Sequence, residues 1–343
     1  MKYAYRNIEL KKRYPLRISR GVFTGSINLF VTIKQGQHEG IGEAAPGFGA
    51  ETAEACEQQL RTFLENQHIG LSPFKAWNSA HTSGVAMCAW AAIDTAIWDL
   101  LARQSGQPLY RLLGLPNHSV PTSVTIGIST PEVVRERVPE MLSRTNAKNL
   151  KIKLGSPEGI DADQAMYAEI QATVRQFDVA LRVDANGGWT LSDAVVMMRW
   201  LRDRDCDYIE QPLSSDSDDQ LPSLFKDRTL PIFIDESCIF STDVARLSQC
   251  IDGVNVKLMK CGGITEALRI VATARAHRLK TMIGCMGESS IAIAAGASIG
   301  ALFDHIDLDS HLNLDPDPAT GLGFGDGIVR IPDTLGHGAH LIC

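Results

Sequence analysis

The sequence predicts an α/β fold: a (β/α)8-type barrel preceded by an N-terminal α+β capping domain that the C-terminal tail completes. After Pro116, short runs rich in β-branched residues alternate with segments of helical pattern. There are eight such runs, and their starts are separated by 21 residues (232 to 253) to 30 residues (150 to 180). A strand, a crossover helix and a second strand at this spacing form a parallel βαβ unit, and eight units close into a barrel. The runs cover residues 123–128, 150–154, 180–185, 208–213, 232–237, 253–259, 281–286 and 305–310.

Residues 1–115 form the predicted capping domain. Strand patterns over 27–33 and 40–44 are joined by a turn at 34–37, and residues 51–114 have helical periodicity. The barrel is assigned to residues 116–315. A Gly-rich segment at 321–327 marks a tail, residues 316–343, which we expect to fold back onto the capping domain.

Composition excludes several classes of protein. The net charge is −7 with no run of like charges, which argues against a nucleic-acid partner. No apolar stretch reaches the roughly 18 residues needed to cross a bilayer, and no apolar signal core follows Met1. A cytoplasmic protein without a membrane partner is therefore expected. The eight cysteines contain no CxxC pair, so buried thiols are favoured over zinc sites or disulfides.

Three acidic residues occur near the ends of successive predicted strands: Asp184, Glu210 and Asp235. Catalytic side chains of such barrels lie at the C-terminal strand ends, so these carboxylates should converge on one part of the rim. A single acid there is as well explained by a helix cap or a salt bridge. Three together require a cation, and an all-oxygen site with open positions suits one Mg²⁺.

Three lysines occupy comparable positions. Lys151 and Lys153 alternate with apolar residues, and Lys257 lies on the sixth strand, opposite the second. Neighbouring ammonium groups and a nearby Mg²⁺ should lower the lysine pKa values, which makes a lysine a usable base. A carbon held between Lys153 and Lys257 could lose a proton on one face and regain one on the other, so its configuration inverts. Lys260 is expected to be a solvated surface lysine.

These residues resemble the enolase superfamily, and its muconate-lactonizing subgroup in particular. The motifs that match are Lys151-Ile-Lys153, Asp184-Ala-Asn186, Glu210-Gln-Pro212, Asp235-Glu-Ser237 and Asn255-Val-Lys257-Leu-Met-Lys-Cys-Gly-Gly263. The resemblance covers nearly the whole chain, including the capping domain. It implies that the three acids bind Mg²⁺, which holds the substrate carboxylate, and that the metal and a lysine stabilise an enediolate.

Asp307-Leu-Asp309 on the last strand is similar to the DxD motif of dipeptide epimerases. In that group the two aspartates hold the α-ammonium of a small dipeptide, while Lys151 would support the carboxylate. Arg20 corresponds in rough position to an arginine that meets the side chain of an epimerised Glu. The resemblance thus implies an isomerase acting on L-Ala-D/L-Glu from murein peptides, and it is compatible with a homo-oligomer.

Two alternatives remain open. The chain could be another muconate-lactonizing-type enzyme, such as an o-succinylbenzoate synthase or a cycloisomerase, whose substrates carry no ammonium. It could also be a catalytically silent barrel that serves as a binding protein. The aspartate pair argues against the first alternative, and the intact acids and lysines argue against the second.

Overall fold

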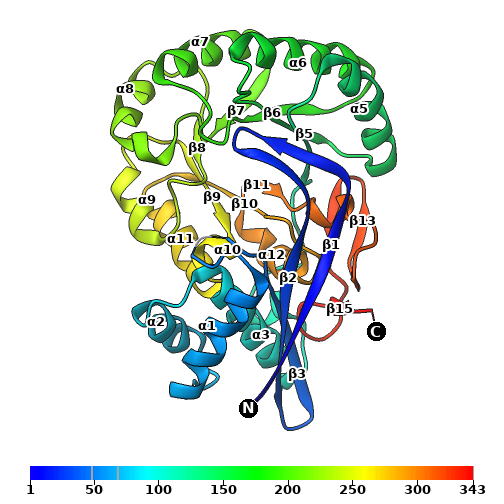
Figure 1. Cartoon of the computed structure of the whole chain (residues 1–343), viewed down its shortest axis with the longest axis vertical. Coiled ribbons are helices and arrows are strands. Elements are labelled where there is room, and N and C mark those ends of the chain that lie inside the picture. Colours follow the sequence, from blue (N-terminus) through cyan, green and yellow to red (C-terminus); the bar gives the residue numbers. More distant parts are fainter. Residues whose placement is uncertain (48, 68, 343) are drawn as a thin grey trace.

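Eight parallel strands form the barrel in the computed structural model, which describes residues 1–47, 49–67 and 69–342 (Figure 1). They follow one another in sequence order, and a bridge between Thr122 and Ile306 joins the first to the last and closes the ring. The predicted fold class is confirmed. The strands are β4 (Ser123–Ile126), β5 (Asn149–Lys153), β6 (Ala180–Asp184), β7 (Cys206–Glu210), β8 (Ile232–Ile234), β9 (Gly253–Lys257), β10 (Lys280–Gly284) and β11 (His305–Asp307).

Helices surround the strands on the outside of the barrel. Local signals fix their ends: Pro131 begins α5, Asn146 ends it in the left-handed conformation, and the Thr190 hydroxyl caps α7. One continuous apolar core fills the space between strands and helices. The helices are α5 (Pro131–Thr145), α6 (Ile160–Thr173), α7 (Leu191–Arg202), α8 (Leu221–Lys226), α9 (Ser241–Leu247), α10 (Leu258–Cys261), α11 (Ile264–Ala276) and α12 (Ser290–Ser298).

An antiparallel meander and four helices make up the capping domain. The meander consists of β1 (Lys2–Ile18), β2 (Gly21–Gln35) and β3 (His38–Ala44), and α3 (Met87–Gln104) packs against it. Gly40 and Gly42 of β3 permit this close packing, because a Cβ at either position would collide with the backbone of α3. The other helices are α1 (Ala53–Asn66), α2 (Pro73–Thr82) and α4 (Leu109–Leu112).

The C-terminal tail packs against the capping domain, since Ala319 and Ala339 cluster with Leu10 of β1 and the His337 N–H donates to Asp99 of α3. Just before the tail, Leu314 bridges to Lys12 of β1, and the Asp315 N–H donates to the Lys11 carbonyl at 2.9 Å. Leu314 also joins a small apolar cluster with Leu10 and Phe30 of the meander. The tail strands are β12 (Ala319–Thr320), β13 (Gly323–Gly325), β14 (Ile328–Arg330) and β15 (His340–Leu341). The domain boundaries at 115 and 315 stay a prediction.

The hairpin of β1 and β2 extends from the capping domain across the barrel mouth (Figure 1). At its tip the Ser19 hydroxyl donates to the Asn186 carbonyl at 2.9 Å. Nearby, the Arg17 guanidinium donates to Glu158 at 2.6 Å. The hairpin therefore covers the end of the barrel at which the predicted site lies.

The described residues include seven of the eight cysteines of the chain. These seven are all free thiols, and six of them are buried. Within the described parts of the chain, no helix is both long and apolar enough to span a bilayer.

Candidate active site

Three buried carboxylates meet at the C-terminal ends of neighbouring strands. Asp184 and Glu210 are the last residues of β6 and β7, and Asp235 directly follows β8. One oxygen from each lies within 4.8 Å of the others, and all three side chains are almost completely buried. The structure thus brings together the acids that the sequence singled out.

Hydrogen bonds with the backbone or side chain of three amide residues hold these acids in place. The Asn186 N–H donates to Asp184 Oδ1 at 2.8 Å, Asn255 Nδ2 donates to Glu210 Oε1 at 2.7 Å, and Gln211 Oε1 accepts the Asp235 N–H at 2.8 Å. Asn186 and Gln211 have positive φ angles of 44° and 37°, so the backbone turns out of the sheet at both residues. Sequence reasoning missed these roles, although Asn186 and Gln211, close behind Asp184 and Glu210 in the sequence, were an available signal.

Burial and neighbouring charge give the acids different pKa values. Burial favours protonation of Asp184, but Lys153 and Lys151 outweigh it and lower the pKa of Asp184 to about 2. Burial and the charge of Asp184 raise the pKa of Glu210 to about 8. Three acids this close repel one another, so a divalent cation among them would favour ionisation of all three.

The residues present fit a magnesium ion. All the candidate ligand atoms are carboxylate oxygens, the donor type that Mg²⁺ prefers. Glu210 Oε2 and Asp235 Oδ1 lie 2.7 Å from Lys151 Nζ and Lys260 Nζ, respectively, yet neither oxygen has the alignment of a hydrogen bond. Buried oxygens with lone pairs left over are what a cation site requires.

Lys153 and Lys257 end β5 and β9, strands separated by four places in the ring of eight. Lys153 Nζ donates to Asp184 at 2.6 Å, and Lys257 Nζ donates to Asp235 at 2.6 Å. The two lysines therefore approach the acid cluster from opposite walls of the barrel. Both side chains are buried.

The carboxylates around Lys151 and Lys257 act against the expected lowering of the lysine pKa values. Burial lowers the pKa of Lys151, but Asp307, Glu210 and Asp184 outweigh it and raise that pKa well above its usual value. The pKa of Lys257 is raised in the same way, chiefly by Asp235. The prediction considered the neighbouring ammonium groups and a metal ion but not these carboxylates, and the lowering of the lysine pKa values by a bound Mg²⁺ stays a prediction.

Lys260 corrects a second expectation, because it is buried and not solvated. Its Nζ lies 2.7 Å from Asp235 Oδ1 and donates to the backbone carbonyls of Cys238 and Asn255 at 2.9 and 3.0 Å, as well as to that of Asp235. The residue belongs to the short helix α10, which folds directly behind β9. This turn carries Lys260 beneath the acid cluster.

Asp307 and Asp309 lie beside the acid cluster, and Lys151 connects the two groups. Lys151 Nζ is 2.6 Å from Asp307 Oδ2 and 2.7 Å from Glu210 Oε2. The strand ends at Asp307, so simple alternation does not extend to Asp309. Both carboxylates nevertheless accept hydrogen bonds from Thr125, Asp309 from its N–H at 2.6 Å and Asp307 from its hydroxyl at 3.4 Å.

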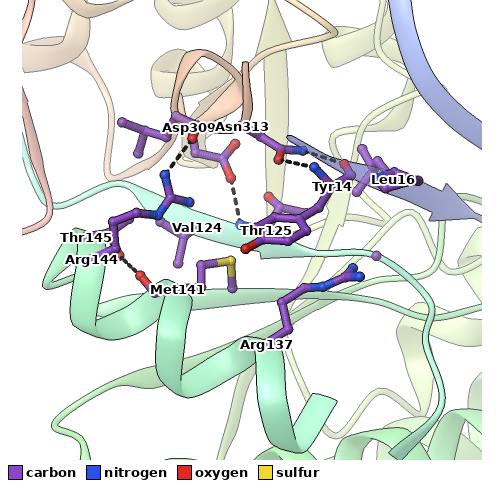
Figure 2. A pocket seen from close by; sticks show the side chains of 13 residues that line it. Tyr14, Leu16, Val124, Thr125, Arg137, Met141, Arg144, Thr145, Asp309 and Asn313 are labelled. Carbon is purple, nitrogen blue, oxygen red and sulfur yellow. Dashed lines mark hydrogen bonds between the residues drawn. The ribbon is translucent and has the colours of Figure 1, made fainter. Parts of the chain in front are cut away.

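Figure 2 shows the surroundings of Asp309 on its other side, a pocket between β1, β4 and α5. The Asp309 carboxylate points at the backbone of Thr125, while Tyr14 and Leu16 of β1 and Arg137 of α5 line the remainder. Burial and the charge of Asp307 raise the pKa of Asp309 to about 6. An ammonium group placed between the two aspartates would relieve their repulsion.

Arg20 lies at the tip of the capping hairpin and is half exposed. Its guanidinium donates to Glu236 Oε1 at 2.6 Å and to the Asn186 carbonyl at 2.8 Å. Glu236 directly follows Asp235 and Asn186 lies two residues after Asp184, so Arg20 reaches the barrel mouth. In this arrangement it ties the hairpin to the barrel.

A closed barrel with buried acids and lysines at its mouth, covered by an α+β domain, defines an enzyme of the enolase type. Residues 3–114 match the mandelate racemase/muconate lactonizing enzyme N-terminal domain, and residues 133–342 match the enolase C-terminal domain-like family. The chain belongs to the enolase superfamily, in this mandelate racemase/muconate lactonizing group. The predicted resemblance is confirmed.

The similar proteins are isomerases. A hydrophobic dipeptide epimerase from Roseobacter litoralis is 61% identical over 99% of both chains. The substrate-liganded L-Ala-D/L-Glu epimerase from Bacillus subtilis has a TM-score of 0.93 at 27% identity, covering 99% of this chain and 98% of that one. A dipeptide epimerase from Enterococcus faecalis, complexed with Mg and L-Leu-L-Tyr, has a TM-score of 0.90 at 32% identity and 98% coverage of both chains. The prediction of an isomerase is confirmed.

Proposed function

We propose that this chain is a Mg²⁺-dependent dipeptide epimerase that inverts the α-carbon of the C-terminal residue of its substrate. The observation that carries the proposal is the position of Lys153 and Lys257 on opposite strands, with the three acids between them. The Enterococcus faecalis epimerase complexed with Mg and a dipeptide supports the same assignment.

Lys153 and Lys257 are the proposed acid and base. A carbon held between them has one lysine on each face, so one Nζ removes the α-proton and the other returns a proton to the opposite face. This 1,1-proton transfer passes through an enediolate of the substrate. The hydrogen bonds to Asp184 and Asp235 hold both lysines in the position that transfer requires.

Asp184, Glu210 and Asp235 are the proposed ligands of the metal ion. Mg²⁺, when bound, supplies positive charge that stabilises the enediolate through the substrate carboxylate oxygens. Asn186, Gln211 and Asn255 keep the three acids in place through the hydrogen bonds described above. Lys151, between Glu210 and Asp307, is the proposed further support of the carboxylate.

Asp307 and Asp309 are the proposed holders of the dipeptide α-ammonium. Their shared contact with Thr125 keeps the two carboxylates together, and paired anions bind an ammonium through charge-assisted hydrogen bonds. The substrates of cycloisomerases and o-succinylbenzoate synthases have no such group. This difference favours a dipeptide over those alternatives.

Two dipeptide classes are candidates for the preferred substrate. The sequence predicts L-Ala-D/L-Glu from murein peptides, with Arg20 on the Glu side chain, and the Bacillus subtilis neighbour supports this choice. A dipeptide of two apolar residues is favoured by the name of the Roseobacter litoralis relative, by the bond from Arg20 to Glu236, and by Val22 and Phe23 exposed on the capping hairpin. We favour the apolar dipeptide because the Arg20 guanidinium already has acceptors.

Proton exchange in D2O tests the proposal directly. The enzyme with Mg²⁺ is incubated with L-Leu-L-Tyr and with L-Ala-L-Glu, and loss of the C-terminal α-proton signal is followed by NMR. Exchange with inversion, removed by a chelator, is expected. Exchange with neither dipeptide, together with turnover of a cycloisomerase or o-succinylbenzoate synthase substrate, would overturn it. Absence of Mg²⁺ binding in a calorimetric titration would instead favour a silent barrel.

Lys257→Ala provides a second test. Removing one of two acid/base groups should lower epimerisation by about 10²- to 10⁴-fold, while exchange initiated by Lys153 continues with one isomer of the substrate. The rates of inversion and of exchange are measured separately from each isomer. Unchanged inversion would remove Lys257 from the mechanism.

A further inference from the structure

Lys12 lies where the inward face of β1 reaches the barrel mouth. Side chains alternate along a strand, and Leu10 on the same face is buried in the cluster with Phe30 and Leu314. Lys12 follows two residues later and bridges to Leu314. The neighbouring Lys11 points to the opposite, exposed face of β1, where its Nζ lies 3.6 Å from Glu9 Oε2. The inward face of β1 thus carries the apolar side chain of Leu10 in the capping domain and the ammonium group of Lys12 where the strand crosses the barrel mouth.

The surroundings of the Lys12 ammonium belong to the loop after β10 and to Asp309. Its Nζ lies 3.8 Å from the position that a Cβ on Gly287 would take. The pKa of Lys12 is lowered by burial, although Cys285, Asp309 and Glu288 act against that change. Cys285 Sγ lies 4.0 Å from Asp309 Oδ1, so these groups form one continuous lining.

The Lys12 ammonium has no hydrogen-bond acceptor and no acid within 4.0 Å among residues 1–47, 49–67 and 69–342. Lys151, Lys153 and Lys257 at the same mouth are all paired with carboxylates. A half-buried ammonium without a protein acceptor is open to an acceptor on a ligand. Cys285 lies in the same loop after β10 as Gly287 and reaches Asp309, so this loop connects the surroundings of Lys12 to the aspartate pair.

We infer that Lys12 sets the charge selectivity for the first residue of the dipeptide: neutral and acidic side chains are accepted there, and Lys or Arg is rejected. The inference rests on the proposed function, in which Asp307 and Asp309 hold the α-ammonium. The first side chain departs from the carbon bonded to that nitrogen, about 1.5 Å away, and therefore begins beside Asp309. A cationic side chain at this point would meet the Lys12 ammonium.

A substrate series with one fixed second residue tests the inference. The compounds are L-Ala-L-Leu, L-Glu-L-Leu and L-Lys-L-Leu, and kcat/KM for α-proton exchange is measured with the Mg²⁺-loaded enzyme. We expect kcat/KM for L-Lys-L-Leu to be about 10- to 100-fold below that for L-Ala-L-Leu. Lys12→Glu should reverse this order. Lys11→Glu makes the same charge change on the outward face and should leave the order unchanged.

The outcomes separate the inference from the proposed function. One outcome is that the wild type catalyses α-proton exchange, and Lys12→Glu and Lys12→Gln rank the three dipeptides by kcat/KM as the wild type does. This would overturn the inference but leave the proposed epimerase function in place. If the wild type exchanges none of a broad dipeptide panel, both fail. Lys12→Gln serves when Lys12→Glu does not fold, as judged by circular dichroism, and it should abolish the discrimination against L-Lys-L-Leu.

Discussion

A charged side chain can be buried in the barrel only where groups of opposite charge or hydrogen-bond partners surround it. Lys260 is an example. Its ammonium is buried against Asp235 and backbone carbonyls. Lys260→Met should lower the free energy of unfolding by about 3–5 kcal/mol, because it leaves Asp235 buried with one fewer cation. Lys280→Met, which breaks an exposed pair with Asp304, should cost at most about 1 kcal/mol. Urea denaturation measures both, and equal losses would contradict this account.

Metal affinity is the second property decided at single residues. Replacing a residue that only hydrogen-bonds to a metal ligand typically lowers metal affinity by about 10- to 100-fold. Glu210 is itself a proposed ligand, so Glu210→Gln should weaken Mg²⁺ binding by at least about 100-fold. Glu236→Gln is the matched control, since this carboxylate adjoins Asp235 but lies outside the cluster of three. Isothermal titration calorimetry compares the two variants. A loss of affinity confined to Glu236→Gln would relocate the site.

At this scale the sequence predicted the acids and lysines but not their environment. A charged residue at the end of an apolar strand can be recognised from the local sequence alone, which is why Asp184, Glu210 and Lys257 could be singled out. Leu314, whose backbone bridges to Lys12, and the acceptors of Arg20 lie more than 150 residues away in the chain. Their contacts depend on how the hairpin crosses the barrel, which no local pattern encodes.

Between elements, two buried acids join the capping domain to the barrel. Glu43 of β3 accepts hydrogen bonds from the N–H groups of Ser289 and Ala292, at 3.0 and 3.2 Å, and so caps α12. Asp94 of α3 does the same for α11 by accepting the Thr265 N–H at 3.0 Å. Each helix N-terminus is thus satisfied by a side chain from the other unit. Such caps were not predicted, because each pairs residues far apart in sequence.

Asp94 makes the contact between α3 and α11 dependent on pH. Burial raises the pKa of Asp94 from its usual 3.8 to about 7, so the folded protein binds this proton more tightly than the unfolded chain. Stability should therefore fall as pH rises from about 4 to about 7, by up to roughly 4 kcal/mol. Asp94→Asn should remove this part of the dependence. Thermal unfolding of both proteins between pH 5 and pH 8 provides the comparison, and parallel curves would refute the assignment.

Across the whole molecule, the tail fastens the capping domain to the barrel. Gly336 has φ +74°, its carbonyl accepts the Leu109 N–H at 2.7 Å, and the space a Cβ would need is filled by the Asp99 carboxylate. Asp99 also accepts the His337 N–H and pairs with Arg103. The overall architecture could be predicted because the eight strands repeat regularly, whereas this fastening involves only a few residues and leaves no periodic signal.

Gly336→Ala tests the importance of this fastening. A non-glycine residue at positive φ already costs about 1–2 kcal/mol of stability. The added methyl should also displace Asp99, so the melting temperature should fall by several degrees more than this strain alone would cause. Gly36→Ala is the control, because Gly36 has φ +63° but nothing within 4 Å of its added Cβ. Equal shifts for the two variants would mean that strain alone, and not the packing of the tail, accounts for the change.

The contact between β1 and the tail has a consequence for the order of folding during synthesis. β1 is synthesised long before Leu314 and Ala339, which pack in one apolar cluster with Leu10 of its inward face. The apolar face of the meander therefore cannot be fully covered until these residues have been synthesised. Until then it is exposed to solvent or shielded by a chaperone. All eight barrel strands are translated before Ala339, so the meander can bury this face completely only after the barrel sequence has been made.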